Sequence, residues 1–553
     1  QPLQTENRDR QLSEALQQLL PQAVALRPAT RAYHQRRANY LRQLGRQADA
    51  ETEQRQADML QPEEAVDHFL LGDEAYQRGD RRQAIAYFTN TLRLEPENFW
   101  ARFLAAITYV QIGQPGLAEV NLSVCQSRQP DFVWIYILRG FVYGQLGEQA
   151  LRTHADAALH FAAAERDFDK ALRLKPNEEA TYNLLVNRGV TRIQGKKYAE
   201  AIADLEQAIQ LRPDHYHAYW NLAQAYQEQK KYDEALGQLD LAIRLQPTLP
   251  LLFHARGRLR LERKDLARAL PDFETAIRLS ETSAGVSVER DMLAEDHAQR
   301  GRILHQQGRA QEALTAYDQA LEALPGYGLA LRSRGTLHYE QKHYDEAIRD
   351  FDAYLKKWQP VPEIYEARGL ARAARKDYDG AFLDYTQALN LEPTSARFAL
   401  RAWIHLFREA PRSALRDFEE AVKLDRKNGD AFAGRGYAHI KSGHLKQAVA
   451  DAEEALLHGQ QTRRHLYNVA RIYAQAAGRV SGDARQPYQR NRDNRSAYEE
   501  RAVGLIRKAL SNIAANQRAA FWRDYIETDA AFNPIRRSDE FSQLAAKYSR
   551  PAK

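Results

Sequence analysis

The chain has 553 residues, of which 44% are hydrophobic and 27% charged, a composition typical of folded rather than disordered proteins. Its single cysteine, Cys125, excludes a disulfide framework and cysteine-ligated zinc or iron–sulfur centres. The formal charge of +6 comes from residues 478–553, which hold 15 Lys and Arg against 9 Asp and Glu, so the rest of the chain is neutral overall. This balance argues against a basic stripe for nucleic acid along most of the chain.

The sequence offers no candidate for a membrane helix, because no stretch reaches the ~18 apolar residues that a span needs. The first residues, QPLQTENRDRQ, include neither a starting Met nor the apolar core of a signal peptide. We therefore expect a cytoplasmic protein with a cut or processed N-terminus.

The first 64 residues predict degenerate repeat helices. Residues 12–28 have the pattern of a second helix of a repeat, and residues 31–64 that of a whole unit. The unit carries small residues and a proline at the positions that recur further along: Ala38, Gly45, Ala50, Ala57 and Pro62.

A period of about 34 residues organises residues 65–477. Twelve units begin near residues 65, 99, 133, 182, 216, 250, 294, 328, 362, 396, 429 and 463. Each has Gly or Ala at its eighth position and Ala at its twentieth, and most end on a proline. Small residues allow two helices to approach closely, and a proline ends the second helix. The pattern therefore predicts a pair of packed helices in every unit.

These units resemble the tetratricopeptide repeat (TPR). The resemblance is clear in DHFLLGDEAYQRGDRRQAIAYFTNTLRLEP, which ends at Pro96, and in HAYWNLAQAYQEQKKYDEALGQLDLAIRLQP, which ends at Pro247. It implies an all-α fold in which antiparallel helix pairs stack into a right-handed solenoid. It also implies a protein-interaction scaffold rather than an enzyme.

Three insertions interrupt the period. The insertion at 148–163 is rich in Ala and predicts longer helices, whereas those at 280–293 and 478–496 predict exposed loops. Residues 478–510 then form an interrupted last repeat, and residues 511–553 predict a helical cap over the final apolar face.

An arginine and an aspartate recur together at the seventh and twenty-third positions. Because the two residues occur together in seven units, we predict a structural ion pair within each; a row of arginines that binds phosphate or carboxylate is the alternative. The predicted pairs are Arg139–Asp167, Arg188–Asp204, Arg256–Asp272, Arg334–Asp350, Arg368–Asp384, Arg401–Asp417 and Arg435–Asp451.

Apolar and aromatic residues gather at the first-helix positions that line the concave face of TPR arrays. Since a contiguous apolar surface suggests a partner site, we predict that these residues bind a peptide or protein, unless the array itself covers them. The predicted residues are Trp100, Phe103, Ile107, Trp134, Ile137, Phe141, Val186 and Trp220. The carboxylate clamp of some peptide-binding TPR modules is not supported, because the matching positions hold Phe69, Asp73, Phe103 and Ile107.

No catalytic or cofactor motif emerges: the sequence lacks a phosphate loop, HExxH, GxSxG and kinase signatures. Cys125 replaces the repeat's small alanine and predicts a packed side chain. We expect no catalytic residues, no metal and no cofactor. Arg485, Arg490, Arg492 and Arg495 leave nucleic-acid binding open as a weak alternative to a solvated insertion.

A second, closer resemblance covers residues 65 to 553. Segments such as PDFVWIYILRGFVYGQLG and RAAFWRDYIETDAAFNPIRRSDEF resemble the TPR region that follows the kinase domain in planctomycete-type bacterial serine/threonine kinases. The leading hypothesis is a scaffold for a protein or peptide partner. The alternative is a regulatory or substrate-recruiting segment of such a kinase or another effector enzyme.

Overall fold

The computed structural model describes residues 30–282, 290–480 and 488–549. The helix expected within 12–28 and Arg485 lie outside these residues. Every regular element in the described ranges is helical, and none is a strand, which confirms the predicted all-α solenoid. No helix among these residues is long and apolar enough to cross a membrane.

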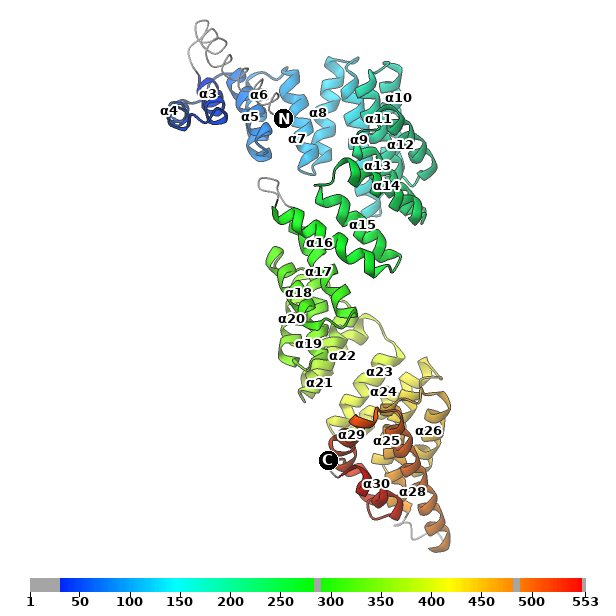
Figure 1. Cartoon of the computed structure of the whole chain (residues 1–553). Coiled ribbons are helices and arrows are strands. Elements are labelled where there is room, and N and C mark those ends of the chain that lie inside the picture. The colour runs from blue at the N-terminus through cyan, green and yellow to red at the C-terminus, as the bar shows by residue number, and fades with distance from the viewer. Residues whose placement is uncertain (1–29, 283–289, 481–487, 550–553) are drawn as a thin grey trace. The chain divides into compact units, whose positions relative to one another are not determined.

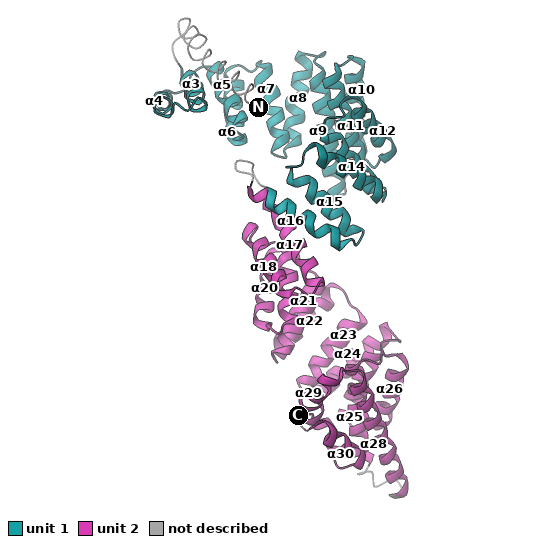
Figure 2. Ribbon diagram, in the orientation of Figure 1, with its two compact units in different colours: residues 1–279 teal, residues 280–553 magenta. Residues whose placement is uncertain are grey.

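The chain divides into two compact units, residues 1–279 and 280–553 (Figure 2). In both units, consecutive helices form antiparallel pairs that follow one another along the stack (Figure 1). The boundary falls near the end of α16.

The first unit contains seven described helix pairs. Their bounds are α3 (Arg31–Gln43) with α4 (Gln47–Met59), α5 (Ala65–Gln77) with α6 (Arg81–Leu94), α7 (Phe99–Gln111) with α8 (Pro115–Arg128), α9 (Val133–Arg152) with α10 (Ala158–Arg173), α11 (Glu178–Gln194) with α12 (Tyr198–Leu211), α13 (Tyr216–Glu228) with α14 (Tyr232–Leu245), and α15 (Pro250–Glu262) with α16 (Leu266–Thr282).

The second unit contains six pairs and then a series of short helices. The pairs are α17 (Arg290–Gln306) with α18 (Ala310–Ala323), α19 (Gly328–Glu340) with α20 (Tyr344–Lys357), α21 (Pro362–Ala374) with α22 (Tyr378–Leu391), α23 (Ser395–Phe407) with α24 (Pro411–Leu424), α25 (Gly429–Lys441) with α26 (Leu445–His458), and α27 (Arg463–Val480) with α28 (Tyr488–Ser511). The short helices are η2 (Ala515–Gln517), α29 (Arg518–Phe521), η3 (Trp522–Glu527), η4 (Ala530–Ile535) and α30 (Asp539–Tyr548).

The small residue at the eighth position of a unit lets an aromatic ring of the second helix pack against the first helix. A Cβ added to Gly72 would lie 2.7 Å from the Phe88 ring, and one added to Gly301 would lie 2.6 Å from Tyr317. Both rings are fully buried. The small residue therefore allows the two helices to approach closely and leaves room for the aromatic ring between them.

The insertions differ in how they are accommodated. The Ala-rich insertion extends α9 to 20 residues, as predicted. The prediction of an exposed loop over 478–496 is wrong for residues 478–480, which end α27, and for residues 488–496, which begin α28; that helix continues without interruption to Ser511. Residues 481–487 lie outside the residues that the structure describes. Contacts four residues apart support this helix: Gln489 Nε2 donates to Asp493 at 3.2 Å and Arg495 Nε to Glu499 at 2.8 Å.

The C-terminal segment after α28, which we call the cap, covers the end of the last repeat. Phe521, Trp522, Ile526, Phe532 and Ile535 are buried in one apolar cluster with side chains of α25, α27 and α28. The last helix pair thus gains an apolar partner that no further repeat provides.

Candidate functional site

A pocket of about 490 Å³ opens on the first helices of three successive pairs, α7, α9 and α11. We call it the aromatic pocket. Its lining is mostly apolar and is contributed by Trp100, Phe103, Ile107, Phe132, Trp134, Ile137, Leu138, Asn183 and Asn187. Pockets of this size and character hold one or a few apolar groups of a ligand.

One wall is a cluster of aromatic rings. The Trp100 ring lies edge-on to Phe103 and Phe132, with centroids 6.2 and 5.8 Å away, and Phe103 and Phe132 are 5.5 Å apart. Trp100 is nevertheless 52% exposed, whereas Phe103 is buried. The cluster therefore holds a large indole in a fixed place on the open surface, as in many interface hot spots.

The floor and the opposite wall come from α9 and α11. Ile137 is buried and closes the floor, so it serves the helix packing as well as the pocket. On α11, Asn183 Nδ2 donates to the carbonyl of Glu179 at 2.9 Å. Asn187 makes no side-chain hydrogen bond within the described ranges, so its amide is available to a ligand.

The structure brings together five of the eight residues predicted for the concave site: Trp100, Phe103, Ile107, Trp134 and Ile137. The other three lie elsewhere. Trp220 lines a separate pocket of about 340 Å³ with polar residues of α13 and α15, and Phe141 and Val186 are half-buried outside both pockets.

Sequence reasoning missed four lining residues. Phe132 precedes the first residue of α9, and Leu138 lies one position beyond those assigned to the concave face. Asn183 and Asn187 are four apart on α11 and therefore share a face, a spacing that could have identified them.

The arginine and aspartate of each predicted pair meet across the two helices of their unit. In all seven pairs the guanidinium donates to the carboxylate at 2.6–3.2 Å through two of its nitrogens. Because each carboxylate neutralises its arginine, the geometry favours a structural role over a row of anion sites.

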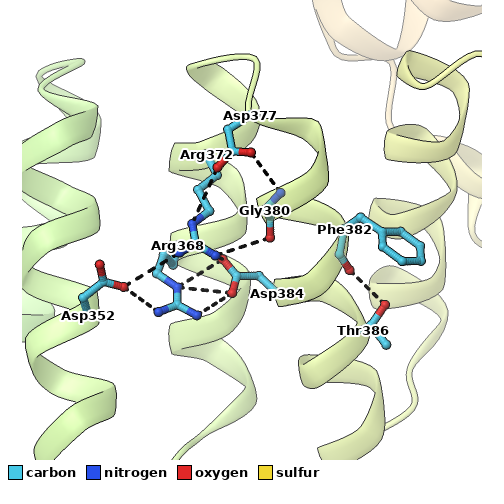
Figure 3. Close-up of polar contacts among 8 residues, drawn as sticks. All are labelled: Asp352, Arg368, Arg372, Asp377, Gly380, Phe382, Asp384 and Thr386. Atoms are coloured by element: carbon cyan, nitrogen blue, oxygen red, sulfur yellow. Dashed lines mark hydrogen bonds and ion pairs between the residues drawn. The ribbon is translucent and has the colours of Figure 1, made fainter.

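These pairs also join neighbouring units, which the sequence did not reveal. Arg368 of α21 donates to Asp384 of its own pair and to Asp352 of the preceding α20, while Arg372 donates to the second oxygen of Asp384 at 3.0 Å (Figure 3). Burial opposes the charge of Arg368, but these carboxylates outweigh that effect and raise its pKa. Asp240 and Asp318 accept from Arg256 and Arg334 in the same way.

Cys125 is packed in the apolar core between α7, α8 and α9. Burial raises the pKa of its thiol to about 11, so the reactive thiolate is scarce at neutral pH. Within the described ranges, no three His, Cys, Asp or Glu side chains are grouped as a metal site would need.

Family models for the tetratricopeptide repeat match residues 69–122, 192–259, 254–328 and 332–396. No curated protein matches the chain. Similar solved structures include a tetratricopeptide repeat protein from Parabacteroides merdae, with 20% identity, a TM-score of 0.33, and coverage of 49% of this chain and 99% of the other. Yeast Tom70 has 16% identity and a TM-score of 0.30 and covers 76% of this chain and 97% of the other.

Pseudomonas aeruginosa PilF has 15% identity and a TM-score of 0.36 and covers 40% of this chain and 96% of the other. All three TM-scores are low, so these likenesses add nothing on function. The family models, the 34-residue period and the stacked helix pairs agree with one another: the chain carries tetratricopeptide repeats arranged as an all-α solenoid.

Proposed function

We propose that the protein is an interaction scaffold and that the aromatic pocket on α7, α9 and α11 binds an apolar segment of a protein partner. Tetratricopeptide repeats generally mediate protein–protein interaction. The main support for the proposal is Trp100, which is half exposed at the edge of the pocket and is held in place by the rings of Phe103 and Phe132. The buried side chain of Ile137 lines the same pocket.

The polar wall suggests how such a segment is held. A peptide presents apolar side chains and backbone amides together. The rings of the pocket match the side chains, and the Asn187 amide can both donate to and accept from a peptide bond.

Affinity purification from native cells with three forms of the protein tests this proposal. Trp100→Ser combined with Ile107→Ser should abolish recovery of a partner that the unaltered protein retains, because both side chains line the pocket. Val120→Ser is the matched control: it removes an apolar side chain that is 56% exposed on α8 of the same helix pair. Equal recovery with all three forms, at unchanged helical circular dichroism, would contradict the proposal.

The resemblance of residues 65–553 to the TPR region of planctomycete-type kinases supports a second candidate, a regulatory or recruiting segment of a kinase. An immunoblot of native cells, followed by mass spectrometry of the band, tests it. A product that carries a kinase domain on the same chain would support this role, and a product without one would exclude it in cis.

A further inference from the structure

A second pocket, of about 470 Å³, lies where the cap meets the last repeats of the second unit. We call it the cap pocket. Trp403 and Phe407 of α23 form one side, five residues of α27 form the base, and Phe521, Tyr525 and Asp529 of the cap form the other side. Because three lining residues come from outside the repeats, the pocket belongs to this chain's own cap and not to the repeat pattern.

The walls of the cap pocket are aromatic and partly open. Phe407 is 51% exposed and Tyr525 is 54% exposed, while Trp403 and Phe521 are buried behind them. Tyr467 joins the two sides, with its ring 6.2 Å from that of Phe521. A large apolar side chain that enters this pocket would lose contact with water and gain contact with the aromatic rings.

The base of the pocket carries more positive than negative charge. The single lining carboxylate, Asp529, is already engaged: it lies 2.9 Å from Arg471 and accepts a hydrogen bond of 2.6 Å from the Tyr467 hydroxyl. Arg463 and Arg464 are exposed, and neither has a carboxylate within 4 Å among the residues that the structure describes. The Arg463 guanidinium also lies over the Phe521 ring, 5.9 Å from its centroid, and the charge of Arg464 contributes, after the hydrogen bond with His465, to lowering the pKa of Asp430. Because both guanidiniums are exposed and lack a close carboxylate, they can still pair with an anionic ligand.

One buried amide also points to a ligand. Asn468 lines the pocket at 8% exposure, and its side chain forms no hydrogen bond to any described residue. Its amide atoms are not among the fully buried polar atoms without a partner, so they reach the pocket, where a ligand's backbone or carboxylate can bond to them in place of water.

We propose that the cap pocket binds a partner peptide in which a large apolar residue lies beside acidic residues. The aromatic walls receive the apolar side chain, while Arg463 and Arg464 pair with the acidic groups and Asn468 bonds the chain between them. A nucleic-acid strand fits less well, because it needs cations repeated along its backbone and the unpaired lining cations sit together on the first turn of α27. This proposal is independent of the one for the aromatic pocket, because the two pockets have no residue in common.

Fluorescence anisotropy at low ionic strength tests the proposal on the full chain. The probe is a fluorescein-labelled peptide with one phenylalanine flanked by glutamates in a glycine–serine background. We expect saturable binding that weakens when the glutamates are replaced by glutamines or the phenylalanine by serine. Arg463→Gln with Arg464→Gln should weaken it about tenfold, a change expected for two partly exposed charge pairs.

Three further forms sharpen this experiment. Arg412→Gln, which alters an exposed arginine of α24 that does not line the pocket, is the matched charge control and should bind as the unaltered protein does. Phe407→Ser should remove the preference for phenylalanine over serine in the probe. Trp100→Ser should leave probe binding unchanged, which separates this site from the aromatic pocket.

Any one of three results would overturn the proposal. The probe could fail to bind saturably, or it could bind the Arg463→Gln/Arg464→Gln and Arg412→Gln proteins with equal affinity. The third result is that labelled oligothymidylate binds more tightly than the peptide.

Discussion

At the scale of single residues, the ion pairs illustrate how one repeated arginine stabilises both its own unit and the junction with the preceding unit. Asp384 is 1% exposed and accepts hydrogen bonds from two arginines. Removing its charge would leave two guanidiniums in a poorly hydrated site, and such one-sided losses are far more costly than losing the pair as a whole.

Asp384→Asn is therefore expected to lower the free energy of unfolding of α21 and α22 by about 3 kcal/mol, the range for breaking a buried ion pair. Amide hydrogen exchange of these two helices measures this effect locally. Asp379→Asn in the same helix is the control, because its carboxylate pairs with Arg408 but is 83% exposed. Similar exchange in the two variants would contradict the structural role of the pair.

A buried histidine makes the second unit sensitive to acid. His297 is 3% exposed, and burial, with a smaller contribution from the charge of Arg300, lowers its pKa to about 4. The unfolded chain binds a proton near the ordinary value of 6.5, so the folded state loses stability as the pH falls from about 6.5 toward 4. The loss approaches ~1.4 kcal/mol per pH unit within this window.

His297→Gln should therefore reduce the fall in thermal midpoint between about pH 7 and about pH 5. His343→Gln, at an exposed position before α20, is the matched control and should retain the fall seen in the unaltered protein. An identical pH dependence in all three proteins would show that His297 does not contribute.

At the scale of elements, the turns within the helix pairs use a left-handed residue. Lys230, between α13 and α14, has φ of 60°, and the corresponding turn between α17 and α18 has Gly308 with φ of 76°. Residues with a Cβ are strained in this region and glycine is not.

Lys230→Gly is expected to raise the free energy of unfolding by about 0.5–1 kcal/mol, since the Lys230 side chain is exposed and the strain removed exceeds the cost of the extra freedom that glycine has in the unfolded chain. Chemical denaturation of the full chain measures the gain. Lys230→Ala retains the Cβ and should show no gain, so equal stabilisation by both substitutions would assign the effect to the lost charge instead.

Much of the fold was predictable because the residue types that recur in the repeat indicate which positions pack against each other. Small residues at fixed spacing indicate where two helices touch, and the joint occurrence of Arg139 and Asp167, or Arg188 and Asp204, indicates a contact across a pair. Contacts between units carry a similar signal, because Asp240, Asp318 and Asp352 each precede their arginine by 16 residues. Asp352 was missed as a partner of Arg368 because only pairs within one unit were compared. The helix over 488–496 was missed because its charged residues pair along the helix rather than with a core.

The candidate site was less predictable than the fold. The rule for concave positions found Trp100, Trp134 and the floor of the aromatic pocket, but it also selected Trp220, which lies in another pocket. The placement of residues outside the regular pattern, such as Phe132 just before α9, depends on the local path of the chain, so the spacing of the repeat does not predict it.

At the scale of the whole molecule, the cap protects the C-terminal end of the second unit. The cap protects the second unit through Trp522, which is 1% exposed and packs against Phe541 and Tyr548.

Trp522→Ala should lower the free energy of unfolding by about 3–5 kcal/mol, the range for a large aromatic side chain removed from a core. It should also increase binding of an apolar dye, whereas Arg523→Ala at the neighbouring exposed position should do neither. A stable, dye-free Trp522→Ala protein would contradict the capping role.

Site-specific photocrosslinking provides a direct test of partner binding at the aromatic pocket. A photoreactive phenylalanine analogue is placed at position 100, inside the pocket, or at position 120, on the exposed face of α8. If a partner occupies the pocket, position 100 should give a discrete crosslinked product in native cells and position 120 should give none. Crosslinks from position 120 alone, or the same products from both positions, would contradict binding at the pocket.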